Sequence, residues 1–114
     1  MQWIILIGNE DFNLNVFRNL QHYGNNKLTI LTKNRIVVDY GHDHIFYEYV
    51  EDLIKDYEPA DLQRIPFQNP QFIMMIYTSE DLMRQIVSQG NFPKDIYIDD
   101  DRGCIVPIKD FIST

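Results

Sequence analysis

The strongest constraint on the fold is an unbroken apolar run at residues 72–77, Phe-Ile-Met-Met-Ile-Tyr. The run is too short for an ordinary helix, and it lacks the alternation of apolar and polar residues that marks a strand with one solvent-exposed face. Such a run is typical of a strand that is buried on both faces. Ser79 follows as a helix cap, and the acidic residues after it favour the positive end of a helix dipole. The run therefore predicts a central strand that leads into a helix, which ends before Gly90 and Pro93.

Similar patterns predict the remaining elements. A second apolar run at residues 3–7 predicts another strand buried on both faces, and apolar residues at helical spacing then predict a helix from residues 9–11 to about residue 22. Further strands are expected at residues 28–31, 35–40, 44–50, 95–99 and 104–108. Pro59 suits the first turn of a short third helix that ends near Arg64. Pro107 removes a ladder donor, so we expect the last strand at a sheet edge.

The order of these elements predicts one domain of the α+β or α/β class, with a mixed sheet of about seven strands and two main helices. The pattern β-α-β-β occurs at residues 1–41 and again at 70–110, and we interpret these stretches as candidate pseudo-repeats. In each, an apolar strand followed by a helix predicts a crossover connection. The expected core comprises Ile5, Ile7, Phe17, Leu20, Ile30, Val38, Met75, Ile76, Ile86 and Ile98.

Composition and charge exclude several classes of protein. A hydrophobic content of 45% in 114 residues favours a packed domain over a disordered chain. The formal net charge is −7 and there is no basic run, whereas proteins that bind nucleic acid or anionic membranes need a cationic surface. A basic protein partner fits this charge, although solubility alone also accounts for it.

Several features bear on localisation. The first apolar stretch is too short for a signal peptide or a membrane span. The single cysteine, Cys104, fits a reducing compartment, and its apolar surroundings predict a buried, unreactive thiol. The low alanine content, with many Ile and Asn residues, is typical of an AT-rich bacterial genome. We therefore expect a cytoplasmic protein.

One motif has the spacing of a metal site. His42 and His44 are two residues apart, so on a strand they would point to the same side, and imidazole is a common ligand of zinc, iron and copper. The string His-x-His-x-x-x-Glu, which ends at Glu48, resembles the first metal motif of cupins, and this resemblance implies a divalent metal. The second cupin motif is absent. Gly41 and Asp43 are ordinary turn residues, so a surface turn without any cofactor is the competing interpretation.

The acidic and aromatic residues suggest a binding surface. Asp99, Asp100 and Asp101 either form a polar turn between two strands or belong to a recognition surface for a basic partner. Tyr57 and Phe67 lie in irregular segments, where we expect aromatic side chains to be exposed, and Tyr is common at interface hot spots. The candidate binding residues are Asp99, Asp100, Asp101, Glu48, Glu51, Tyr57 and Phe67.

The leading functional hypothesis is a non-enzymatic module that binds a basic protein, such as an immunity protein against a toxin nuclease. Carboxylates would then take the place of nucleic-acid phosphates in the active site of the toxin. One alternative is a small metal-dependent enzyme that uses His42 and His44. Another is a structural subunit that forms homo-oligomers through an exposed sheet edge.

Overall fold

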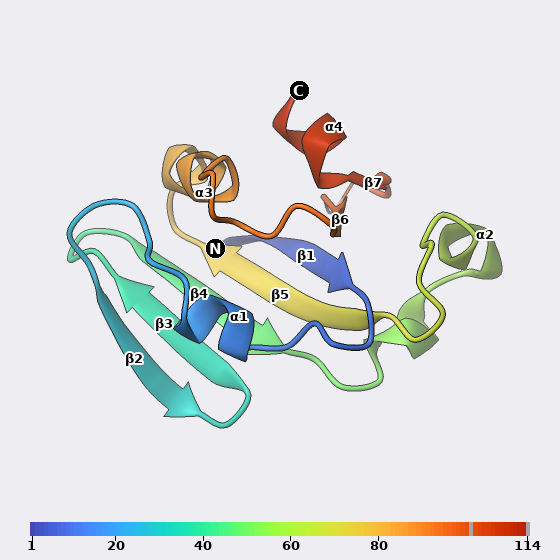
Figure 1. Cartoon of the computed structure of the whole chain (residues 1–114), viewed down its shortest axis with the longest axis horizontal. Coiled ribbons are helices and arrows are strands. Elements are labelled where there is room, and N and C mark those ends of the chain that lie inside the picture. Colours follow the sequence, from blue (N-terminus) through green and yellow to red (C-terminus); the bar gives the residue numbers. More distant parts are fainter. Residues whose placement is uncertain (101, 114) are drawn as a thin grey trace.

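A computed structural model describes residues 1–100 and 102–113 and shows one seven-stranded sheet flanked by helices (Figure 1). The strands are β1 (Gln2–Gly8), β2 (Lys27–Thr32), β3 (Arg35–Asp39), β4 (His44–Tyr49), β5 (Gln71–Tyr77), β6 (Tyr97–Asp99) and β7 (Ile105–Pro107). The helices are α1 (Asn15–Arg18), α2 (Pro59–Leu62), α3 (Glu80–Val87) and α4 (Ile108–Ile112), with a 3-10 helix, η1, at Leu53–Asp56. The prediction of a single α+β domain with seven strands is confirmed.

The strand order is β2-β3-β4-β5-β1-β6-β7, so the apolar run in β5 forms the central strand, as predicted. All neighbouring strands pair antiparallel, which differs from the mixed pairing that we expected. The alternating directions make β1 parallel to β2 and β5 parallel to β6, although neither pair is adjacent in the sheet. Each of these pairs is linked through a helix, α1 or α3, so both expected crossover connections are present. The proposed repeat of residues 1–41 and 70–110 stays a prediction.

The two faces of the sheet pack against different segments, which explains why the apolar run in β1 has no alternation. Ile4 and Leu6 point into the main core on the first face, together with side chains of α1, α3 and α4. Ile5 and Ile7 point into a smaller core on the second face. That core lies beneath residues 53–67, which contain η1 and α2 and which we call the covering segment. In Figure 1, α2 lies at the right, away from the other helices.

Most of the expected core is confirmed. The buried members are Ile5, Ile7, Phe17, Val38, Met75, Ile86 and Ile98. Leu20 and Ile76 are half-buried. The prediction for Ile30 was wrong, because this side chain is 57% exposed on β2, a strand at the sheet edge with a neighbour on one side only.

The long helix expected from residues 9–11 to residue 22 was also wrong, since α1 is a single turn. The side chains of Asn9 and Asn13 accept hydrogen bonds at 2.9 Å from the backbone N–H groups of Asp11 and Asn15. Such local bonds offer the backbone an alternative to helical hydrogen bonding. Phe17 nevertheless reaches the main core, so the pattern identified a buried residue in a backbone that is mostly irregular.

The other helices and the C-terminal region give a mixed result. The Ser79 hydroxyl accepts a hydrogen bond from the Leu82 N–H at 3.2 Å, which confirms the predicted cap of α3. The last strand lies at the sheet edge, as Pro107 predicted, but it ends there and α4 begins at Ile108. The buried thiol was wrong, because Cys104 is exposed in the turn before β7.

Candidate functional site

The predicted histidine pair lies at a hairpin turn. His42 is exposed between β3 and β4, next to Gly41, whose φ of 93° suits glycine. His44 begins β4, and its Nε2 lies 3.2 Å from Oδ1 of Asp39. No group of three or more His, Cys, Asp or Glu side chains placed to hold a metal occurs within residues 1–100 and 102–113. The turn interpretation accounts for both histidines, and the metal site stays a prediction.

Two of the predicted binding residues come together on the second face of the sheet. The Tyr57 hydroxyl donates a hydrogen bond to Oδ2 of Asp99 at 2.8 Å, which ties the covering segment to β6. Burial raises the pKa of Tyr57 well above its usual value, and the hydrogen bond to Asp99 and the negative charges of Asp99, Asp61 and Asp56 raise it further. The negative charges of three carboxylates from two distant segments therefore act on one hydroxyl, and Asp99 is hydrogen-bonded to it. We call Asp56, Asp61 and Asp99 the acidic patch.

The covering segment itself holds three acidic residues and two basic ones, Lys55 and Arg64, for a net charge of −1, and two further acidic residues come directly before it. Residues 51–61 contain five acidic residues against one lysine, a net charge of −4. Lys55 lies 3.8 Å from Asp52, but Asp56, Glu58 and Asp61 take part in none of the ion pairs found within the described part of the chain. Carboxylates without a cationic partner leave a negative field at this surface.

The other predicted binding residues have different surroundings. Glu48 pairs with Arg35 on β3 at 3.3 Å, and Glu51 is exposed. Oδ1 of Asp100 accepts hydrogen bonds from the backbone N–H groups of Arg102 and Cys104, at 3.0 and 3.4 Å, so this side chain holds the β6–β7 turn. Asp101 lies outside the described residues.

The two aromatic residues that we expected to be exposed are half-buried. Tyr57 stacks on Phe72 at a centroid distance of 5.3 Å, and Phe67 packs edge-on against Tyr97 at 6.0 Å. Both side chains hold the covering segment against the sheet. We expected them to be exposed because the sequence around them is irregular, and an irregular sequence does not reveal such packing.

The second face also carries a row of apolar side chains that sequence reasoning missed. Register aligns Trp3 with Ile76, Ile76 with Phe46, and Phe46 with Val37, across four adjacent strands. Trp3, Phe46 and Ile76 are half-buried, and the Arg35 guanidinium lies 4.7 Å from the centre of the Phe46 ring. We call these four side chains the open row, because three of them keep part of their surface exposed; Val37 is 8% exposed, and Trp3 also packs against the smaller core beneath the covering segment. Only strand register reveals such a row.

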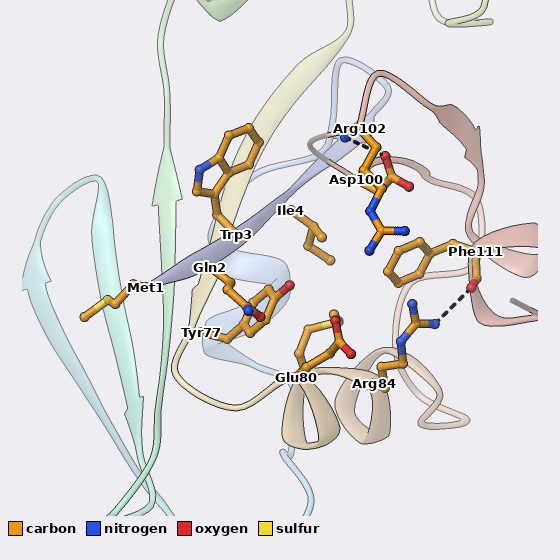
Figure 2. Close-up of a pocket in the computed structure, with 11 residues that line it drawn as sticks. Met1, Gln2, Trp3, Ile4, Tyr77, Glu80, Arg84, Asp100, Arg102 and Phe111 are labelled. Carbon is orange, nitrogen blue, oxygen red and sulfur yellow. Dashed lines mark hydrogen bonds between the residues drawn. The ribbon is translucent and has the colours of Figure 1, made fainter.

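A cavity of about 390 Å³ opens where β1 begins, between β5, α3 and the C-terminal segment (Figure 2). Arg84 of α3 donates a hydrogen bond from Nη1 to the Phe111 carbonyl at 3.2 Å, and its guanidinium lies 4.6 Å from the centre of the Phe111 ring. Arg102 enters the cavity from the β6–β7 turn. The carboxylates of Glu80 and Asp100 line the same space.

These features define an acidic α+β protein with one antiparallel sheet, a row of mostly half-buried apolar side chains on its second face and a separate polar cavity. No model of a protein family, no curated protein and no solved structure matches the chain. Among the helices of the described residues, none combines the length and the apolar composition needed to cross a bilayer.

Proposed function

We propose that this protein is a non-enzymatic cytoplasmic module that binds a basic protein through the second face of its sheet. The observation that carries this proposal is the position of the acidic patch beside the open row. Asp99 pairs with Ile5 in the sheet register, and Trp3 lies two residues before Ile5, on the same side of β1. A partner that covers Trp3 therefore also meets the carboxylates.

The two features supply different parts of an interaction. Large aromatic side chains at the centre of an interface contribute most of the binding free energy, and the open row offers Trp3 and Phe46 for this purpose. The negative field speeds the encounter with a basic partner and selects against acidic ones. The combination supports recognition of a protein with an apolar spot next to a cationic surface.

A specific version of this proposal is an immunity protein that covers the active site of a toxin nuclease. Such active sites are cationic because they bind the phosphates of nucleic acid. The carboxylates of the acidic patch would bind the same cationic groups in place of the phosphates. The acidic patch draws its charges from the covering segment and from β6, which the hydrogen bond between Tyr57 and Asp99 holds together.

The test uses a variant with both Asp56→Asn and Asp61→Asn. Its matched control is Asp81→Asn with Asp110→Asn, which removes the same charge from exposed positions on α3 and α4. Partners captured from the source cells are identified, and the affinity of the purified partner is measured by calorimetry at low and high salt. We expect the patch variant to bind about tenfold more weakly at low salt, with a smaller loss at high salt.

The proposal is wrong if the patch variant and the control bind the same partner equally well at both salt concentrations. Trp3→Ala examines the open row in the same assay, with thermal unfolding measured on each sample to exclude loss of folding. We expect it to weaken binding at both salt concentrations, because contacts between apolar groups depend little on ionic strength.

A further inference from the structure

Two arginines, Arg84 and Arg102, line the cavity where β1 begins, in an otherwise acidic protein. Neither Arg84 nor Arg102 takes part in an ion pair found within residues 1–100 and 102–113. Figure 2 shows both guanidinium groups directed toward the Phe111 ring, one from α3 and the other from the β6–β7 turn. Two guanidinium groups that face one space can both donate to a single bound oxyanion.

Arg84 is held in place for such a role. Its hydrogen bond to the Phe111 carbonyl uses one N–H group, and its guanidinium lies over the Phe111 ring, 4.6 Å from the ring centre. A guanidinium carries five donors in a rigid fork, which matches the oxygen atoms of a phosphate or carboxylate. Among the hydrogen bonds of the described residues, the other donors of Arg84 have no partner, so they can serve a bound oxyanion.

The acidic lining determines what else the ligand must carry. Glu80 and Asp100 would repel a phosphate placed next to them, so the anion belongs on the arginine side. Carboxylates accept hydrogen bonds, which hydroxyl groups supply. A volume of about 390 Å³ is at the small end of ligand sites, which span roughly 300–1,000 Å³.

We propose that this cavity binds the phosphate monoester of a small polyol. The phosphate lies between Arg84 and Arg102, where both guanidinium groups can donate to its oxygen atoms, and away from the two carboxylates. The hydroxyl groups of the polyol donate to Glu80 and Asp100. This site uses no residue of the acidic patch and shares only Trp3 with the open row, so it can fail while the proposed protein interaction holds.

The experiment titrates the whole protein with glycerol 3-phosphate, inorganic phosphate, glycerol and sodium acetate. Calorimetry measures the affinity, because the Trp3 indole points away from Arg84, Arg102 and Phe111 and is therefore a poor fluorescent reporter of this site (Figure 2). We expect saturable binding that is strongest for glycerol 3-phosphate, weaker for inorganic phosphate and undetectable for glycerol.

Two variants establish where the ligand binds. Arg102→Gln removes one cation from an exposed turn and should weaken the binding of glycerol 3-phosphate about tenfold. Arg64→Gln makes the same change at an exposed position next to α2 and should leave the affinity unchanged. Because the Asp100 side chain bonds the backbone of Arg102, the turn does not depend on the substituted guanidinium.

The proposal is overturned if no phosphate compound gives saturable binding, or if Arg102→Gln and Arg64→Gln have equal effects. It is also overturned if acetate binds as tightly as glycerol 3-phosphate, because the cavity would then recognise a single negative charge rather than a phosphate monoester.

Discussion

At the scale of single residues, His22 is a polar side chain buried in the main core, with 6% of its surface exposed. Its Nε2 lies 2.9 Å from the hydroxyl of Tyr47, which is fully buried and stacks on Phe17 at a centroid distance of 4.2 Å. Burial lowers the pKa of His22 from 6.5 to about 4, against a smaller opposing effect from a hydrogen bond with the Leu20 backbone. The folded protein therefore holds a neutral imidazole at neutral pH.

This predicts a specific dependence of stability on pH. As the pH falls below about 6.5, His22 becomes protonated in the unfolded chain, whereas in the folded protein it stays neutral until about pH 4. The free energy of unfolding therefore decreases across this interval. The loss attributable to His22 should reach about 2 kcal/mol by about pH 5. His22→Gln should lack this component, as shown by urea denaturation at about pH 7.5 and about pH 5.

The exposed His42 provides the control for this measurement, since His42→Gln leaves the buried imidazole in place. The control should lose as much stability between the two pH values as the unsubstituted protein. Equal losses in His22→Gln and His42→Gln would show that the buried imidazole is not responsible.

At the scale of elements, the end of β1 is determined by packing. A side chain at Gly8 would place its Cβ within 3.0 Å of the side chain of Phe12, which is buried in the main core. The turn between them is closed by a hydrogen bond from the Phe12 N–H to the Asn9 carbonyl at 3.1 Å. β1 therefore ends at Gly8, where the Phe12 side chain packs against the backbone of the strand.

Gly8→Ala should therefore destabilise the protein by about 1–3 kcal/mol, because Phe12 has to shift in a packed core. Gly90→Ala is the matched control, since a Cβ there meets nothing within 4 Å and the backbone needs no left-handed conformation. We expect the control to change stability little or to raise it slightly. Urea denaturation of both variants measures the difference, and equal free energies of unfolding would contradict the packing explanation.

The observed strands and helices show how much of the fold a local sequence pattern can predict. Strands were predictable because a local apolar pattern is enough to identify them, and the cap of α3 depends on Ser79 alone. The helix expected near residue 9 failed because side-chain hydrogen bonds of Asn9 and Asn13 compete with helical ones. Tyr57 and Asp99 were both candidates, but their contact joins positions 42 residues apart, and the open row depends on strand register. Neither is visible in a local pattern.

At the scale of the whole molecule, the strand order places the first strand inside the sheet. β1 pairs with β5 along its whole length and with β6 on its other side, so both partners follow it far along the chain. Leu6, at the middle of β1, is fully buried, whereas Leu31 on the edge strand β2 is 48% exposed. Two leucines in the same sheet thus have opposite environments.

Leu6→Ala should lower the free energy of unfolding by about 2–5 kcal/mol, because it leaves a cavity at the centre of the sheet. Leu31→Ala removes the same atoms at the edge and should cost less than about 1 kcal/mol. Chemical denaturation of the two variants compares them directly. A similar loss in both would mean that β1 does not occupy the interior position.

The two edges of the sheet also differ, and this sets a limit on assembly. β7 has three residues, includes Pro107 and continues directly into α4, so it offers little backbone to another strand. β2 has six residues and exposes Ile30 and Leu31 beside its unpaired backbone. Two copies that joined through β2 around a two-fold axis would use up both receptive edges. Such a pair would have no free end from which to grow, so homo-association of this protein should stop at a dimer instead of continuing into a fibre.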